Sequence, residues 1–348
     1  MSMKTISAKA KEILNDPQLI AERDQWFGRL QAIFDGQTSD SVFAVNGVIA
    51  NSAAYDPYSQ PYEWMMDSLE LLAVEANRIK NPYMFVPLCV ETGHFGVHFT
   101  DRIFGARVFF QDGQWNAACL KTPVGCLEKP SLDCETVRIT REAIQAFLDA
   151  DVALPLMGLP TIASALNVAV NLYGEEILVA LVTESESAAH DFQIINETLI
   201  ALHRMYQTLL PTKQLQPVIS WNRTQPPGYG QLCGCTTQLI SGEDYRKYVA
   251  PLDNELLSAY EHGGMIHLCG SHLQHLETFR DMSGLKAVQV NDRAACDLKE
   301  YFEGLRDDQI IYLNPCLGMT VERAMEITGG RRLVIADHLN RVILIFQR

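Results

Sequence analysis

Short apolar runs rich in β-forming residues alternate with longer stretches of helical periodicity along most of this chain. Eight such runs stand out, and the last four are spaced by about two dozen residues, roughly one strand plus one crossover helix. Strands joined by helices form parallel sheets, and eight of them suggest a closed barrel. An open, doubly wound sheet is the main alternative. The runs are Val42–Val48, Met84–Val90, Val152–Met157, Val218–Trp221, Met265–Cys269, Ala287–Val290, Ile310–Leu313 and Leu333–Ala336.

The remaining patterns fit around this repeat. Apolar residues at helical spacing over Ser7–Phe34 predict helices in an N-terminal extension, residues 1–40. Ala106–Lys121 is expected as a hairpin insertion, and Arg341–Phe346 is a candidate further strand. We therefore expect residues 1–348 to form a single domain, a (β/α)8 TIM-type barrel with a helical N-terminal extension. Two stretches are expected as insertions at its rim, the helical Glu186–Leu210 and the loop Thr224–Gly234.

The charge of the chain argues against several partners. Its 348 residues carry a formal net charge of -14, and such a surface repels phosphate backbones and anionic lipids. Neither nucleic acid nor a membrane is therefore expected as a partner, and no apolar run approaches the roughly 20 residues of a membrane span. The first residues lack the apolar segment of a secretion signal. The nine cysteines have no disulfide-framework spacing, so we expect a cytoplasmic protein with reduced thiols.

One strand end carries the most informative motif. In the segment Gly264–Gly270, alternation along the strand places Met265, His267 and Cys269 on the same side. His267 and Cys269 come at the end of the run, where a parallel barrel assembles its active site. An imidazole and a thiolate on one strand face form a soft site that suits zinc. The alternative is a packed imidazole beside a buried thiol.

Cys316 offers a third ligand from another strand. It follows the run Ile310–Leu313, two strands beyond the strand of His267, and alternate strands share layers inside a barrel. Three protein ligands leave the fourth tetrahedral position of a zinc open, as in catalytic sites. Two thiolates cancel the zinc charge, and such a metal lowers the pKa of an incoming thiol without making hydroxide readily. Alkyl transfer to sulfur therefore follows more naturally than hydrolysis.

These residues resemble the uroporphyrinogen decarboxylase superfamily, in its corrinoid-dependent methyltransferase branch. The resemblance rests on His267-x-Cys269-Gly270, on Cys316 in an Asn-Pro-Cys turn, and on the segment Leu239–Pro251. Leu156–Tyr173 is a weaker match to the loop after the third strand. The likeness covers the second half of the chain well and the first half loosely.

The resemblance implies a TIM-type barrel with zinc held by His267, Cys269 and Cys316. It implies methyl transfer from a methylated corrinoid protein to a small thiol, often coenzyme M. Because no Asp-x-His-x-x-Gly cobalamin motif occurs, the corrinoid is expected on a separate partner protein that docks at the barrel mouth. The decarboxylase branch's Arg-rich N-terminal signature is absent near Val42–Val48, which argues against a tetrapyrrole decarboxylase. A fourth ligand is open among Asp292, Asp337, His338 and Glu91.

Other polar residues keep alternative interpretations. Cys233 and Cys235 are a second metal or redox pair, a source of another zinc ligand, or two small buried residues in a tight loop. Glu91, His94 and His98 cluster after the second strand, where they would contact substrate from a rim loop. The other five cysteines are expected to be packing residues.

His272 and His275 follow the zinc strand. His272 is close enough to be a supporting or acid–base group, although a partly exposed helix histidine is the safer expectation.

Two further functions remain open. A metal-free decarboxylase or lyase on the same barrel would need arginines at the mouth, and Arg223 and Arg293 are the candidates. A non-catalytic corrinoid- or protein-binding module would use its cysteines structurally. Absence of metal, or a zinc closed by four protein ligands, would favour the binding module.

Overall fold

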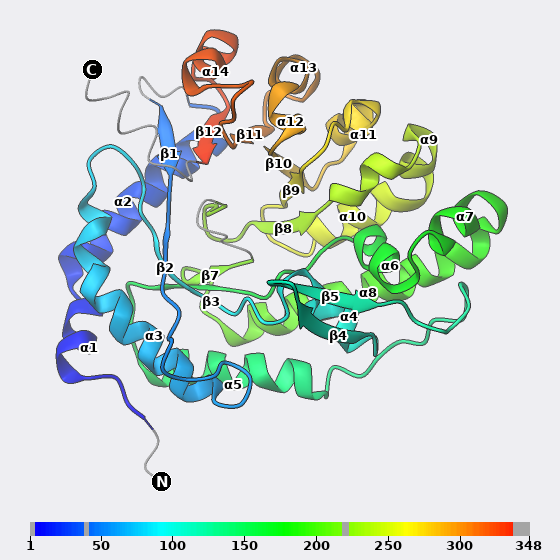
Figure 1. Cartoon of the computed structure of the whole chain (residues 1–348). Helices are drawn as coiled ribbons and strands as arrows, with labels where there is room; N and C mark the ends of the chain where they lie inside the picture. The colour runs from blue at the N-terminus through cyan, green and yellow to red at the C-terminus, as the bar shows by residue number, and fades with distance from the viewer. Residues whose placement is uncertain (1–3, 38–41, 218–222, 337–348) are drawn as a thin grey trace.

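The structure is a computed structural model that describes residues 4–37, 42–217 and 223–336. Parallel strands form two sheets, with helices packed around them (Figure 1). One sheet has six strands in the order β1-β12-β11-β10-β9-β8, and the other has four in the order β2-β3-β6-β7. The chain is therefore an α/β protein, as predicted. The strands of these sheets are β1 Phe43–Val45, β2 Val48–Ile49, β3 Leu88–Glu91, β6 Leu156–Gly158, β7 Leu215–Gln216, β8 Gly230–Cys233, β9 Gly264–Leu268, β10 Leu285–Val290, β11 Ile310–Leu313 and β12 Leu333–Ala336.

The two sheets join along the first predicted strand. β1 pairs with β12 and β2 pairs with β3, while an isolated bridge connects Val45 to Phe85. On the other side, no backbone ladder joins β7 to β8 in the described part of the chain. There the Gln216 side chain makes two hydrogen bonds to the backbone of Gln225, and Gln225 donates to the Gly230 carbonyl. The arrangement is consistent with a TIM-type barrel, although closure between these strands is not seen.

Helices fill the connections between strands and cover the outside. Ser7 and Asp16 cap the first two helices through their side chains, and Pro17 opens the second. The α-helices are α1 Ala8–Leu14, α2 Pro17–Phe34, α3 Pro61–Glu75, α4 Phe99–Ile103, α5 Glu135–Asp149, α6 Ala165–Tyr173, α7 Glu176–Thr183, α8 Ser185–Leu209, α9 Gly242–Asp244, α10 Ala250–Leu257, α11 Leu276–Asp281, α12 Arg293–Cys296, α13 Leu298–Gly304 and α14 Val321–Thr328. Shorter turns are η1 Ala76–Lys80, η2 Gly96–His98, η3 Cys235–Leu239, η4 Tyr245–Val249 and η5 Leu273–His275, of which η4 is a π-helix.

Most predicted elements are found, and one predicted loop differs in part. The predicted hairpin over Ala106–Lys121 is present as β4 Arg107–Gln111 and β5 Gln114–Ala118, which pair antiparallel. The predicted loop Thr224–Gly234 is wrong in part, because its end forms β8. A glycine and a glutamine hide that strand from an apolar pattern. The predicted strands Val218–Trp221 and Arg341–Phe346 lie wholly outside the described residues.

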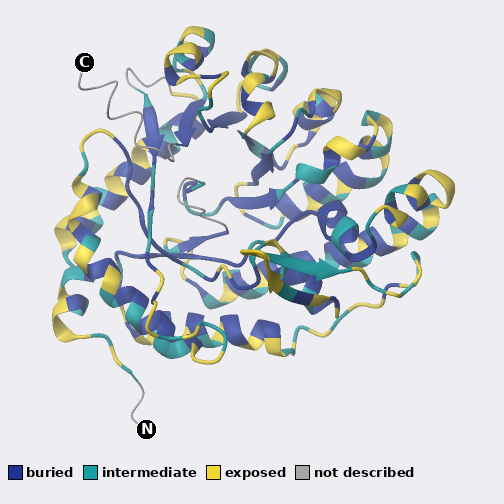
Figure 2. Ribbon diagram, viewed as in Figure 1, coloured by how far each residue is buried: buried dark blue, intermediate teal, exposed yellow. Residues whose placement is uncertain are grey.

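Burial follows the strands. The strands of both sheets are mostly buried, and the surrounding helices turn exposed residues outward (Figure 2). Because the strands of each sheet run parallel, their carboxyl ends lie at one edge, where buried backbone gives way to loops. Within the described residues no single helix is long and apolar enough to cross a membrane. α6 and α7 pass that test only together, as a pair bent by 115°.

Candidate metal centre

The register of three neighbouring strands brings polar side chains to one face. Cys233 at the end of β8 is paired with His267 on β9, and His267 is paired with Gln289 on β10. Partners in register on parallel strands project to the same side of a sheet. A thiol, an imidazole and an amide therefore lie in a row inside the carboxyl edge of the six-stranded sheet.

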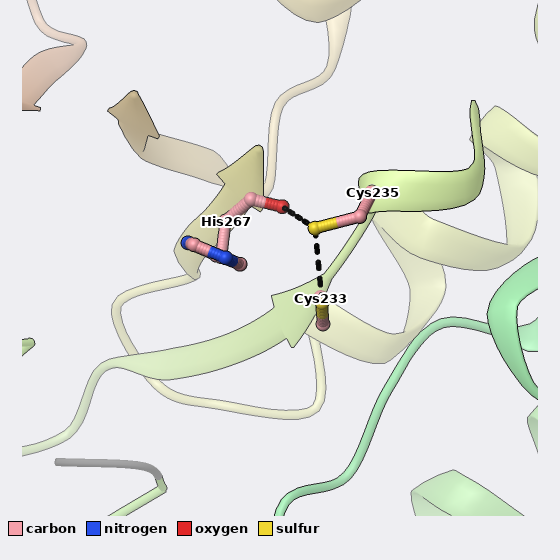
Figure 3. A group of neighbouring side chains, drawn as sticks. All are labelled: Cys233, Cys235 and His267. Atoms are coloured by element: carbon pink, nitrogen blue, oxygen red, sulfur yellow. Dashed lines mark hydrogen bonds between the residues drawn. The ribbon is translucent and has the colours of Figure 1, made fainter. Parts of the chain in front are cut away.

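The Cys233-Gly234-Cys235 turn adds a second thiol to this row. The Gly234 amide donates to the His267 carbonyl at 2.9 Å, which ties the turn to β9. A Cβ at Gly234 would lie 2.6 Å from Cδ1 of Ile266, so a larger residue here would force the Ile266 side chain to move. The Sγ atoms of Cys233 and Cys235 are 3.5 Å apart (Figure 3). The ligand atoms of Cys233, Cys235 and His267 all lie within 4.8 Å of one another, so this group could hold a metal ion.

Cys269 brings a third thiol to the group from the end of β9. Its Sγ lies 3.1 Å from Sγ of Cys235 and 3.1 Å from Nε2 of His267. In a tetrahedral zinc site with bonds of about 2.3 Å to sulfur and about 2.0 Å to nitrogen, sulfurs lie about 3.8 Å apart and sulfur and nitrogen about 3.5 Å apart. The observed spacings of 3.5 Å and 3.1 Å between sulfurs and 3.1 Å between sulfur and nitrogen are shorter than these values by about 0.3–0.7 Å. The residues therefore fit a single zinc ion, with only small outward shifts.

Gln289 determines which nitrogen of His267 is available. Nδ1 of His267 lies 2.6 Å from Oε1 of Gln289, while Nε2 of Gln289 donates to Oδ1 of Asn314 at 2.6 Å. The amide oxygen of Gln289 can only accept, so Nδ1 of His267 carries the proton. The lone pair is then on Nε2, the nitrogen that faces Cys269.

The thiols share protons in the metal-free cluster. The Cys235 thiol donates to Cys269 and also contacts Cys233, which lowers the pKa of both neighbours. The guanidinium of Arg223 and the neighbouring imidazole of His267 lower these pKa values further, against the effect of burial. The pKa of Cys235 is raised, because its neighbours hold the negative charge. A cluster with ready thiolates suits a soft metal.

Arg223 is the cation beside the cluster. Its Nη2 donates to Nε2 of His267 at 3.3 Å, and no carboxylate lies within 4.0 Å of it among the described residues. The guanidinium thus places a positive charge next to three thiols at the carboxyl edge. Arg293, the other arginine considered from the sequence, begins α12.

Cys316 lies apart from this cluster. Its Sγ is 3.9 Å from Sγ of Cys296 and 4.0 Å from the carbonyl oxygen of Asp292. No hydrogen bond links Cys316 to His267 or Cys269 in the residues described. The structure thus brings together two of the three ligands predicted from the sequence, and the assignment of Cys316 remains a prediction.

The other candidates occupy separate places. Glu91 and His94 line a pocket of about 260 Å³ beyond β3, where Nε2 of buried His94 donates to the Pro57 carbonyl at 2.9 Å. His98 bonds instead to the buried carboxyl of Asp101, with 2.6 Å between Nδ1 and Oδ2. Of the remaining fourth-ligand candidates, Asp337 and His338 lie outside the described residues.

Sequence reasoning missed two supporting residues. Gln289 is the one polar residue in the buried end of β10, Ala-Val-Gln-Val, and a polar side chain in such a run needs a partner. Asn167 on α6 donates to Sγ of Cys233 at 3.6 Å and accepts from the Thr236 amide at 3.2 Å. Nothing in the local sequence of α6 indicates that contact, because it joins residues far apart in the chain.

Comparisons with known proteins bear on the fold. No protein-family model and no curated protein matches the chain. The solved structure of a methyltransferase from Methanosarcina mazei is similar, with a TM-score of 0.61 and 13% sequence identity. The match covers 90% of this chain and 92% of that one. At this identity the likeness shows a shared fold over nearly the whole chain.

Proposed function

We propose that this chain is a zinc-dependent methyltransferase that moves a methyl group from a methylated corrinoid protein to a small thiol. The observation that carries the proposal is the cluster of thiols and imidazole at the carboxyl ends of β8 and β9. Its spacings fit one soft metal ion, and that edge is where parallel α/β folds place their active sites. The shared fold with a methyltransferase supports the same reaction class.

His267 and Cys269 are the core of the proposed ligand set. Cys235 or Cys233 supplies a third ligand from the adjacent strand, and Cys316 is the alternative third ligand that the sequence indicates. Either choice uses three protein ligands and leaves one tetrahedral position for the acceptor. If all four clustered side chains bound the zinc, no tetrahedral position would remain for the acceptor. The reaction therefore requires that one of the three thiols does not bind the metal.

The residues of the chain prepare the site for a thiol acceptor. Gln289 holds His267 with Nε2 directed at the cluster. Arg223 offsets the negative charge that two or three thiolates accumulate. When bound, zinc would lower the pKa of the acceptor thiol toward neutral pH, so that thiolate forms there, while leaving its sulfur nucleophilic. In the transfer the acceptor loses its proton, the sulfur–carbon bond forms, and the cobalt keeps the electron pair of the broken cobalt–carbon bond.

The first experiment is the zinc content of the purified protein and of single variants. We expect about one zinc per chain in the wild type and less than about a tenth of that in Cys269→Ala, because both ligand sets use Cys269. Cys233→Ala, Cys235→Ala and Cys316→Ala separate the two sets, since only a variant that lacks a true ligand loses metal. Cys119→Ala, at an exposed cysteine away from the cluster, is the control.

The outcome also tests the function. Zinc-loaded protein is then assayed for thiol-dependent demethylation of methylcobalamin, with a panel of small thiols. A wild type that is purified without chelators and holds no metal would refute the zinc mechanism. The metal-free lyase, with Arg223 at the site, would then be the better hypothesis. A zinc held by all four clustered side chains, with no position open to a thiol, would point to a structural site.

A further inference from the structure

Thr237 connects the two loops that carry the clustered thiols. It is fully buried in η3, two residues after Cys235. Its hydroxyl donates to the Gly234 carbonyl at 2.9 Å and lies 2.9 Å from Nδ1 of His272. Its carbonyl accepts a hydrogen bond from Nε2 of His275 at 2.8 Å. Both histidines belong to the segment that follows Cys269, so one threonine binds the Cys269 loop twice.

The hydrogen-bond inventory fixes the direction of these bonds. A hydroxyl has one proton, and Thr237 gives it to Gly234, so Nδ1 of His272 must be the donor. The carbonyl of Thr237 can only accept, so Nε2 of His275 is also a donor. Each histidine is then neutral with one proton, which agrees with burial lowering the pKa of both and that of His272 to about 4. Both rings are fully buried, where the sequence suggested partial exposure.

These bonds account for a close approach of two thiols that the β8–β9 ladder does not pair. Cys235 lies in η3, beyond the end of β8, and Cys269 lies beyond the end of β9, so the β8–β9 ladder pairs neither residue. Their Sγ atoms are nevertheless only 3.1 Å apart. Within the described residues, the Thr237 bonds to His272 and His275 are the side-chain links that join these two loops most directly.

We propose that Thr237, His272 and His275 are positioning residues that hold Cys235 against Cys269 and so set the geometry of the metal site. The proposal rests on the proposed function, in that the site is taken to bind zinc. None of the three side chains is a ligand. They act by fixing the loops before the metal arrives, and residues that orient metal ligands in this way typically change metal affinity by about 10–100-fold when they are replaced.

The test uses Thr237→Val, which keeps the shape and the carbonyl but removes the hydroxyl. We expect the zinc dissociation constant, measured by chelator competition, to rise by about tenfold or more. Thr237→Ser restores the hydroxyl and is expected to bind zinc like the wild type. The cobalt-substituted proteins give a second signature, because the sulfur-to-cobalt charge-transfer band reports how many thiolates reach the metal.

Thr140→Val is the matched control. Thr140 is also fully buried, donates to a carbonyl three residues earlier at 2.9 Å, and lies 2.9 Å from the hydroxyl of Tyr206. It lies on α5, away from the thiols. Loss of the Thr140 hydroxyl should lower the free energy of unfolding about as much as loss of the Thr237 hydroxyl. It should leave the zinc affinity and the cobalt spectrum unchanged.

A metal-free measurement separates this proposal from the proposed function. In chelator-treated Cys233→Ala protein, diamide oxidises Cys235 and Cys269 to a disulfide that peptide mass spectrometry identifies. Thr237→Val should slow this cross-link at least tenfold, and Thr237→Ser should not. An unchanged cross-linking rate would overturn the positioning role, even if the wild type binds zinc. A wild type without zinc would defeat the proposed function, and the cross-linking rate would still decide the positioning role.

Discussion

Gln289 is the residue on which the orientation of the His267 ring depends. Its side chain accepts the Nδ1 proton and is itself held by Asn314. Replacement by leucine removes this bond and leaves Nδ1 of a buried ring without a partner. We expect Gln289→Leu to weaken zinc binding by about 10–100-fold, measured by chelator competition.

The control for this variant is Gln309→Leu. Gln309 is also a fully buried amide, and it donates to the carbonyls of Phe279 and Leu285 at 2.8 and 3.1 Å. Its replacement should destabilise the fold without changing the affinity for zinc. Equal zinc affinities in wild type and Gln289→Leu would mean that the ring is oriented by its strand alone.

At the scale of single residues, the sequence could predict that His267 and Cys269 lie together, but not that Cys233 and Cys235 join them. His267 and Cys269 share a strand, so the alternation of side chains is sufficient to place them together. Cys233 reaches His267 only because β8 and β9 pair in one particular register, which is a long-range property. The short contacts of Cys235 depend further on the Gly234 turn and on Thr237. The sequence favoured Cys316 over Cys233 and Cys235 as a ligand, and in the structure the Cys316 thiol lies beside that of Cys296.

At the scale of elements, β9 to β12 could be predicted because apolar runs and helical stretches alternate there with a regular spacing. β7 and β8 could not, since β7 has two residues and β8 contains a glycine and a glutamine. Such strands are defined by their neighbours in the sheet and not by an apolar pattern. The two sheets therefore lack a connecting ladder, among the described residues, where local sequence carries least information.

The helical segment before β9 contains a buried tyrosine–aspartate pair. Tyr245, which opens the π-helix η4, donates to the carboxyl of Asp253 on α10 at 2.9 Å. Both side chains are buried, and burial raises the pKa of Asp253 from 3.8 to about 7. A raised pKa means that the folded state binds the proton more tightly than the unfolded chain. The stability contributed by the protonated carboxyl is then present below pH 3.8 and lost as the pH rises to about 7.

Asp253→Asn removes this titration. We expect the free energy of unfolding of the wild type to fall between about pH 4 and pH 7, by up to about 4 kcal/mol from this group. The variant should lose most of that pH dependence in urea unfolding, while Asp281→Asn, at an exposed carboxyl, should keep it. If the free energy of unfolding depended on pH in the same way in the wild type and in Asp253→Asn, folding would not raise the pKa of the Asp253 carboxyl.

At the scale of the whole molecule, the sheet order ties the beginning of the chain to its end. β1 pairs with β12, and α2 packs against this junction through Trp26, whose ring centroid lies 5.7 Å from that of Phe43. Arg23 of the same helix donates to the carbonyls of Ala153 and Leu154, just before β6. Contacts of such long sequence separation make separate unfolding of the two halves costly. The chain is therefore expected to unfold as one cooperative unit.

Ile335→Ala tests that cooperativity. Ile335 is fully buried on β12, beside Ala44 of β1 and Leu313 of β11, and its truncation should cost about 2–5 kcal/mol. Tryptophan fluorescence reports mainly on the N-terminal half through Trp26, Trp64 and Trp115, whereas circular dichroism reports on all helices. In one cooperative unit both signals shift together, although the substitution is in the last described strand. If the fluorescence transition of Ile335→Ala matched that of the wild type while the dichroism transition shifted, the chain would consist of two folding units. Val182→Ala, at an exposed position on α7, should move neither signal by more than about 0.5 kcal/mol.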